Sequence, residues 1–340
     1  MPLQPQRIAH SGRAVGLTFI PLILILVASL QAQQPVKVAT DPDKAGPDFA
    51  VQGEYASAID KVKFGAEVVA RGDGKFMVNL LPGGLRGEGG DYAKRAEGTA
   101  KTEGDQVVVS GKDGKWSAVI AGGLMSVKSP AGEKFNLHKV TRKSKTAGQK
   151  PPPGAVILFG GQDASEWVNG KIVDGNLLGS EIDSKRKFKD HKLHLEFRLS
   201  FMPFATGQGR SNSGVYPQHR YEVQVLDSFG LKGANNECGG IYSQAAPLVN
   251  MCYPPLQWQT YDIDFTTARF DPDGKKKLAN ARMTVWHNGV KIHDNYELKK
   301  GPTGGGRAET PEGGPLHLQG HGGQVQYRNI WVVETDKDQK

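Results

Sequence analysis

Hydrophobic and polar residues alternate one by one in several segments, the pattern of β-strands that bury one face. The clearest case is residues 192–201, where the inward positions would be Leu193, Leu195, Phe197, Leu199 and Phe201. Residues 221–227 repeat the pattern, with Tyr221, Val223 and Val225 on one face. Glu222, Gln224 and Leu226 then lie on the other face, which predicts a sheet with a carboxylate beside an amide. Such a face, next to a turn rich in Asn, Ser and Gly at 210–214, suits a ligand covered with hydroxyl groups, such as a sugar.

The first half of the chain predicts a small antiparallel β domain over residues 49–140. Its expected strands are 66–70, 75–80, 106–110, 116–120 and 134–140, separated by turns such as Asp73-Gly74 and Asp113-Gly114. A polar tether is expected before it at 33–48. The basic, proline-ending stretch 141–153, TRKSKTAGQKPPP, predicts a spacer and a domain boundary after it. The role of this first domain stays open.

The second domain is expected over residues 154–334. Its predicted strands are short and evenly spaced: 156–159, a hairpin at 171–179, 192–201, 221–227, 240–244, 258–265, 282–287, 290–293, 315–319 and 325–333. Roughly ten strands of this kind favour two packed sheets, a jelly-roll sandwich. The 44 glycines and 20 prolines fit the same fold class, an all-β protein.

The N-terminus predicts export. Residues 1–32 combine Arg7 and Arg13, an apolar core and a cut site after Ala32, as in a secretory signal peptide; an uncleaved anchor is the alternative. The mature protein is then expected to lie in the periplasm or outside a bacterial cell, with no stable membrane insertion.

In an oxidising compartment, Cys238 and Cys252 are predicted to form a disulfide, with two buried thiols as the alternative. The net charge of +8 is too modest to indicate a nucleic-acid partner.

Several motifs, taken in order, resemble the 3-keto-disaccharide hydrolase family over about residues 154–334. They are LFGGQDASEW, HLEFRLS, SNSGVY, YEVQVLDS, GGIY, WQTYDIDF, TVWHNGVKI and PLHLQGHGGQVQYRNIWV. The resemblance implies a concanavalin A-like jelly roll, export from a bacterium and action on glycosides oxidised to a ketone at C3. The chain departs from the family pattern at Gly320, where an acidic or polar residue usually precedes the His-Gly pair. A side chain that would help to hold His321 is therefore missing.

The strand at 221–227 also carries a chemical argument of its own. Sandwich glycosidases of the laminarinase type place two carboxylates on one strand as E-x-D-x-E, because one protonates the leaving oxygen while the other attacks. Here Gln224 and Leu226 follow Glu222 at that spacing, so a second carboxylate would have to come from Asp227, Glu196 or Glu237. A 3-keto sugar needs only one base, because the ketone acidifies the C2 proton and the C1 substituent can leave by elimination.

The residues expected to carry this chemistry fall into two groups. The catalytic candidates are Glu222, His321 and Asp227, and the candidates for substrate binding are Asn212, Tyr216, Gln224, Tyr242 and Gln319. Each has a structural alternative: an ion pair of Glu222 with Arg220 or Arg198, a surface-loop histidine, an Asx turn at Asp227, or aromatic residues of the core. His317, Gln319 and His321 alternate and could, with Glu222, hold a divalent cation, although no compact ligand motif is present.

The sequence therefore predicts an exported enzyme that cleaves 3-keto-glycosides by C2 proton abstraction, elimination and hydration. Its competitor is a non-catalytic, lectin-like carbohydrate-binding protein. An enzyme is expected to bring Glu222 and His321 within reach of one water or substrate, whereas a lectin site is expected to be ringed by amides and aromatic residues with its carboxylates paired.

Overall fold

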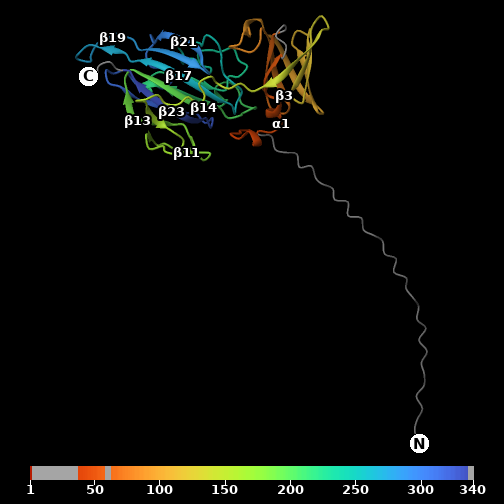
Figure 1. Ribbon diagram of the computed structural model, residues 1–340, viewed down its shortest axis with the longest axis horizontal. Helices are drawn as coiled ribbons and strands as arrows, with labels where there is room; N and C mark the ends of the chain where they lie inside the picture. The colour runs from red at the N-terminus through yellow and green to blue at the C-terminus, as the bar shows by residue number, and fades with distance from the viewer. Residues whose placement is uncertain (2–36, 58–62, 336–340) are drawn as a thin grey trace. The chain divides into compact units, whose positions relative to one another are not determined.

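The structure, a computed structural model, describes residues 1, 37–57 and 63–335. The predicted signal peptide at 1–32 lies outside the described residues, apart from Met1. Within them, no helix is long and apolar enough to cross a membrane. The only α-helix in these ranges is α1 (Pro47–Val51), and short 3₁₀ turns occur at η1 (Pro42–Lys44), η2 (Tyr92–Lys94), η3 (Gly207–Gly209) and η4 (Pro217–His219). The chain is otherwise built from antiparallel strands, which confirms the all-β prediction (Figure 1).

The first half forms a closed eight-stranded barrel, drawn in orange to yellow in Figure 1. Its strands, in barrel order, are β1 (Gly53–Ser57), β2 (Phe64–Ala70), β3 (Lys75–Pro82), β4 (Ala96–Glu103), β5 (Gln106–Gly111), β6 (Ser117–Ala121), β7 (Leu124–Lys128) and β8 (Lys134–Val140). Pairing of β1 with β8 closes the barrel. Asp73 and Gly74 both have positive φ, as the predicted Asp-Gly turn requires.

The second half contains two antiparallel sheets. The five-stranded sheet has the order β10 (Trp167–Val168), β13 (Ile182–Phe188), β22 (Gly314–Gly320), β15 (Asn212–Tyr216) and β16 (Val223–Leu226). The eight-stranded sheet has the order β11 (Ile172–Val173), β12 (Leu177–Leu178), β23 (Gln326–Glu334), β14 (His191–Arg198), β17 (Trp258–Thr266), β20 (Arg282–His287) and β21 (Val290–Glu297), and β9 (Val156–Phe159) pairs with β23. A separate hairpin joins β18 (Arg269–Phe270) and β19 (Lys277–Ala279).

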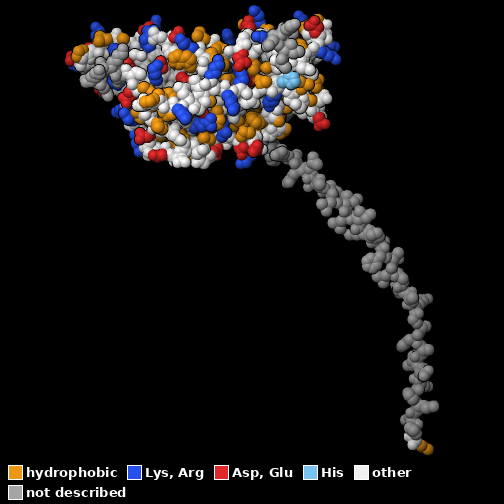
Figure 2. Space-filling model, viewed as in Figure 1, with side chains coloured by type: hydrophobic (Ala, Val, Ile, Leu, Met, Phe, Trp, Pro, Cys, Tyr) orange, Lys and Arg blue, Asp and Glu red, His pale blue; other side chains and the backbone are white. Residues whose placement is uncertain are grey.

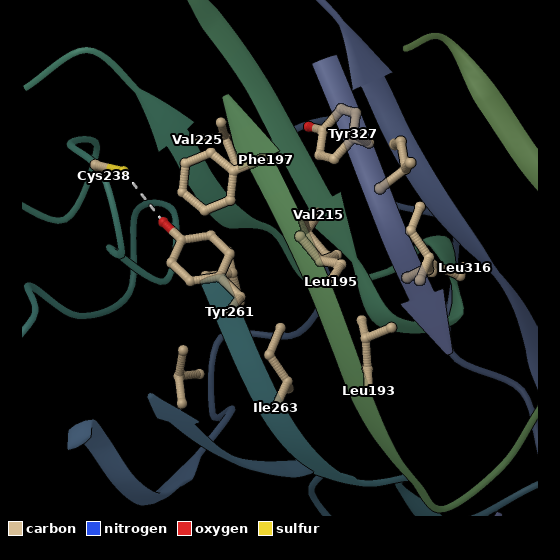
Figure 3. Close-up of a cluster of buried hydrophobic side chains, with 14 of the residues drawn as sticks. Leu193, Leu195, Phe197, Val215, Val225, Cys238, Tyr261, Ile263, Leu316 and Tyr327 are labelled. Carbon is tan, nitrogen blue, oxygen red and sulfur yellow. Dashed lines mark hydrogen bonds between the residues drawn. The ribbon is translucent and has the colours of Figure 1, made fainter. Parts of the chain in front are cut away.

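Apolar side chains of both sheets share one buried core (Figure 3). Leu193, Leu195 and Phe197 come from β14, while Val215 and Val225 come from the five-stranded sheet. The inward positions predicted from the alternation at 192–201 are therefore confirmed up to Leu199. Phe201 instead joins a second cluster formed by the barrel, where Ala39 pairs with it.

Four local predictions fail in the structure. Residues 240–244 form no strand, because Ile241 makes only isolated bridges to Val223 and Ala245. The Asn-Ser-Gly turn instead belongs to strand β15, and the stretches 53–57, 96–103 and 124–128 are barrel strands that the pattern did not reveal. The described part of the expected tether, from residue 37, is packed, since Ala39 and Ala45 are buried. Cys238 and Cys252 are both free, buried thiols rather than a disulfide.

The stretch at 141–153 is held along the molecule by specific contacts. Arg142 forms an ion pair with Glu54 of the barrel, Thr146 donates to Asp262 at 2.8 Å, and the amide of Gly148 donates to Glu196 at 2.6 Å. Polar hydrogen-bonding side chains therefore fasten the predicted spacer to β1 at one end and to the outer face of the eight-stranded sheet at the other.

Candidate functional site

The outer face of the five-stranded sheet gathers most of the predicted site residues. Directly opposite residues on neighbouring antiparallel strands present their side chains on the same face. Tyr216 of β15 lies opposite His317 of β22, and His317 lies opposite Asp183 of β13. Gly214 lies between Gln319 of β22 and Gln224 of β16. The sheet therefore places an aromatic hydroxyl, a carboxylate, an imidazole and two amides in two adjacent rows.

Glu222 precedes β16 and directs its carboxylate onto this face. The neighbouring Gly214 makes room for it, because a Cβ there would lie 2.5 Å from Oε1 of Glu222. The Glu222 side chain is buried, yet it lies outside the apolar core that Tyr221, Val223 and Val225 enter. The predicted two-faced pattern at 221–227 is thus confirmed.

The carboxyl of Glu222 has an unusual protonation equilibrium. Burial raises its pKa to about 7, and a hydrogen bond with Tyr216 offsets part of this effect. No second carboxylate and no cation contribute to this shift among the described residues. The predicted ion-pair alternative does not occur, since Arg220 donates to Gln218 and Thr310, and Arg198 donates to Gln326. A carboxyl that titrates near neutral pH is suited to proton transfer.

Tyr216 and Gln319 complete the immediate surroundings of Glu222. The amide of Gln319 donates to the Tyr216 hydroxyl at 2.9 Å, and this hydroxyl donates to the carbonyl of Gly304 at 2.5 Å. Burial and the Glu222 charge raise the pKa of Tyr216 well above its ordinary value. The tyrosine therefore keeps its proton and can donate a hydrogen bond to an oxygen that gains negative charge.

A loop between β21 and β22 covers this site; we call residues 298–313 the covering loop. Thr303 donates to the carbonyl of Tyr242 at 2.7 Å, and the amide of Arg307 donates to the carbonyl of His219 at 2.7 Å. A Cβ on Gly304 would lie 2.2 Å from Oε2 of Glu222. The Gly-rich covering loop thus closes over the Glu222 carboxylate.

The predicted sugar ligands Asn212 and Gln224 are engaged by a second covering segment. Gln208 of η3 accepts hydrogen bonds from the side chains of both, through its carbonyl at 2.8 Å and its Oε1 at 3.0 Å. The Oδ1 atom of Asn212 is buried and has no hydrogen-bond partner. An unpaired buried acceptor is costly unless a ligand or water satisfies it, so this atom is a candidate acceptor for a sugar hydroxyl.

The structure records no contact of Asp227 or His321 with Glu222 among the described residues. Asp227 is buried, accepts a hydrogen bond from Nε of Arg210 at 2.5 Å and caps the amide of Phe229, which makes it a structural residue of the loop after β16. His321 directly follows β22 and is exposed. The other acids considered for a second carboxylate are also engaged: Glu237 accepts two loop amides, and Glu196 lies on the other sheet. Although burial opposes it, hydrogen bonds from His194, Asn329 and neighbours lower the pKa of Glu196 to about 2.

The structure adds two residues that the sequence pattern did not reveal. Asp183 accepts hydrogen bonds at Oδ1 from Nδ1 of His219 at 2.7 Å and Nδ1 of His317 at 2.9 Å. The two imidazoles are stacked, with ring centroids 3.8 Å apart. His219 lies in the turn between β15 and Glu222, but nothing in the local sequence connects it with Asp183, which is 36 residues away. The divalent cation set proposed from sequence shares only His317 with this cluster.

Two solved structures from Parabacteroides distasonis, each described as a "putative glycosyl hydrolase", are similar to the chain. One is 31% identical, covers 54% of this chain and 84% of its own, and has a TM-score of 0.48. The other is 17% identical, covers 54% and 94%, and has a TM-score of 0.39. No curated protein matches the chain.

A family model described as the 3-keto-alpha-glucoside-1,2-lyase-like domain matches residues 154–333. This range includes every residue of the site described above and both sheets, apart from Glu334 at the end of β23. It extends over more than half of the chain and confirms the resemblance carried by the sequence motifs. The protein therefore belongs to the 3-keto-alpha-glucoside-1,2-lyase-like family, and it is a glycoside-acting enzyme.

Proposed function

We propose that the second half of the chain cleaves 3-keto-glycosides by elimination across C1 and C2, followed by addition of water. The observation that carries the proposal is a single buried carboxyl, Glu222, whose pKa is raised to about 7 beside two hydrogen-bond donors. Direct displacement at C1 would call for a second available carboxylate. The other carboxylate described on this face, Asp183, is engaged by His219, His317 and Arg307. The description of the family model, a 1,2-lyase-like domain for 3-keto-glucosides, supports the same reaction.

The proposed steps follow from the chemistry of a β-leaving group next to a ketone. Glu222, as the carboxylate, removes the proton from C2, and the electron pair of the C2–H bond forms an enolate with the C3 carbonyl. Tyr216 and the Gln319 amide would stabilise the negative oxygen by hydrogen bonds. The C1–O bond then breaks, the double bond moves to C1–C2, and the ketone re-forms. Addition of water to C1 of this enone gives net hydrolysis.

The remaining predicted residues receive supporting roles in this proposal. With Glu222 acting as the base, exposed His321 is the proposed acid for the leaving oxygen. Asn212, Gln224 and Tyr242 are proposed to hold sugar hydroxyls after Gln208 and the covering loop have moved. Asp227 is left out, because its carboxylate is engaged by Arg210. A carbohydrate-binding protein without activity is less well supported, since Glu222 has no cationic partner in the described part of the chain.

The test is incubation of the purified protein with a 3-keto-glucoside and with its unoxidised parent. We expect release of the aglycone from the ketone substrate only. In deuterated water, elimination predicts exchange at C2 or a kinetic isotope effect for deuterium at that carbon. Equal cleavage of both compounds, or release without any isotope effect or exchange at C2, would contradict the mechanism. Binding of both sugars without cleavage would favour the carbohydrate-binding alternative.

A further inference from the structure

The cluster of Asp183, His219 and His317 has the composition of a transition-metal site. Its ligand atoms, one carboxylate oxygen and two imidazole nitrogens, all lie within 4.8 Å of one another. The two shortest separations, 2.7 Å and 2.9 Å, both end at Oδ1 of Asp183. Ligand atoms around a tetrahedral zinc ion with bonds of about 2.0–2.2 Å are roughly 3.3–3.6 Å apart, so small outward movements of these side chains would admit a cation.

The second oxygen of Asp183 is fixed from another direction. Arg307 of the covering loop donates to Oδ2 at 2.7 Å, which leaves Oδ1 directed at the two histidines. Hydrogen bonds of this kind orient ligating carboxylates in metal sites. The cluster is also shielded, since His317 is buried and the other two residues are half-buried. A carboxylate held in this way is prepared to act as a one-oxygen ligand.

The backbone positions His219 at an energetic cost. Gln218 and His219 both have positive φ, 57° and 55°, a conformation that is strained for residues other than glycine. The side chain of Gln218 holds the turn: its Nε2 donates to the carbonyl of Phe188 at 2.9 Å, and its Oε1 accepts from Arg220 at 2.7 Å. The turn therefore keeps the His219 ring against that of His317 despite the strain.

We propose that Asp183, His219 and His317 bind one divalent first-row transition-metal ion, such as Zn²⁺. Two imidazoles and one carboxylate suit such metals, whereas Mg²⁺ and Ca²⁺ prefer oxygen ligands alone. Three protein ligands are typical of catalytic zinc sites, which keep a position for water or substrate. Tyr216 connects the cluster to Glu222, because its ring packs against that of His317 at 5.2 Å and its hydroxyl interacts with the carboxylate.

The site gives the ion a role that rests on the proposed function. A cation at this cluster would be separated from the base, Glu222, only by the Tyr216 side chain. It would polarise a ketone or hydroxyl oxygen of the sugar and favour formation of the enolate. Metal binding itself does not depend on that role. The two proposals can therefore fail separately.

The binding experiment uses the purified full-length protein after treatment with a chelator. Calorimetric titration with Zn²⁺ and the visible absorption of added Co²⁺ report stoichiometry and coordination. We expect one equivalent per chain and a thermal midpoint that rises with Zn²⁺. His219→Ala and His317→Ala should each weaken binding by at least about 100-fold. The matched control is His321→Ala, which removes an exposed histidine four positions after His317 and should leave the affinity unchanged.

A second pair of variants separates a ligand from a simple hydrogen-bond donor. His317→Asn and His219→Asn place an amide N–H where Nδ1 lies, so they retain the bond to Asp183 but provide a poor metal ligand. We expect them to fold with near wild-type stability in the chelated state and to lose the Zn²⁺-dependent rise of the midpoint. Zn²⁺ binding that survives in both asparagine variants, or no stoichiometric binding by the wild-type protein, would overturn the proposal.

Activity assays then distinguish the two proposals. Stoichiometric metal binding without cleavage of a 3-keto-glucoside would reject the proposed function and retain the metal site. Cleavage that proceeds at the same rate in chelated and Zn²⁺-loaded protein would reject the catalytic role of the ion. We expect restoration of activity on adding Zn²⁺ to chelated wild-type protein, and little restoration in His317→Asn.

Discussion

Glu222 is the site residue whose surroundings change its ionisation most clearly. Its carboxyl is buried and has no cationic partner among the described residues, so the charged form is disfavoured until the pH approaches about 7. Below that pH the group is neutral, and above it the protein holds a buried charge. Activity and stability should therefore respond to this one residue in opposite directions.

The first prediction concerns pH. The folded pKa of Glu222 lies above its ordinary value of 4.5, so the folded state binds more protons between about pH 4.5 and pH 7. Stability should then fall as the pH rises through this window, by at most about 3 kcal/mol. kcat/KM should rise over the same window, because the base must be ionised. Denaturant titrations and initial rates at a series of pH values measure the two effects.

Glu222→Gln is the variant that isolates the group. It should reduce the rate by about two to four orders of magnitude. It should also flatten the fall in stability between pH 4.5 and 7. An unchanged stability profile in this variant would assign the pH dependence of folding to other residues.

Some site residues could be found from sequence because local pattern is enough to place them. The alternation at 221–227 separates Glu222 from the core. His317 and Gln319 are two positions apart in a strand, so their side chains lie on one face. Asp183 could not be found in this way. Its strand β13 reads IDSKRKF, which has little apolar alternation, and its pairing with His317 joins residues 134 positions apart.

At the scale of elements, the covering loop depends on glycines for close approach. Gly304 and Gly305 are adjacent and both have positive φ, 66° and 87°. A Cβ would meet the Glu222 carboxylate at the first position, whereas nothing lies within 4 Å at the second. The pair offers a comparison in which backbone strain is shared and only the steric contact differs.

The second prediction follows from that comparison. Gly304→Ala should displace the covering loop, which would expose Glu222 and bring its pKa toward its ordinary value. The midpoint of the pH–rate profile should therefore move down from about 7. Gly305→Ala should destabilise the loop by about 1 kcal/mol through its backbone alone and leave the midpoint in place. Identical profiles for the two variants would show that the loop does not set the environment of Glu222.

The strands illustrate why a pattern can be sufficient for one element and not for another. β14 is predictable from sequence because large apolar residues alternate along its length. β4 reads AEGTAKTE, whose small and polar residues predict no buried face, yet it pairs with both β3 and β5 in the barrel. The β4 segment is a strand because the closed barrel needs it to pair with both β3 and β5. The strand propensity of a single segment does not report on pairing with distant segments.

At the scale of the whole molecule, a buried polar network joins the barrel to the sandwich. Arg86, in the loop after β3, forms an ion pair with Glu67 at 2.8 Å and also donates to the carbonyl of Leu231. Asn79 of β3 donates to the carbonyl of Gly230 at 2.7 Å. Over the surface, by contrast, acidic and basic side chains are interspersed, as Figure 2 shows for one face. The buried network is therefore the place to look for coupling between the two halves.

The third prediction tests that coupling. Arg86→Ala leaves Glu67 buried without its cation and should lower the free energy of unfolding by about 3–5 kcal/mol. Calorimetry of the wild-type protein should show one transition for both halves. The double variant Arg86→Met, Glu67→Gln should recover part of the loss, because no buried charge remains unpaired. Two transitions in the wild type, with only one affected by Arg86→Ala, would show that the halves unfold independently.

The covering loop finally implies a constraint on how tightly the protein can hold a substrate. With the loop in place, Glu222 and Tyr216 contact Gly304, so a sugar can bind only to the fraction of molecules in which the loop has moved away. The apparent dissociation constant equals the intrinsic value divided by that fraction, so a loop open in about one molecule in a hundred weakens binding about 100-fold. Sugars that form few contacts beyond the reacting ring would then bind too weakly to offset the cost of opening the loop. Selection among glycosides would thus begin before the ketone reaches the base.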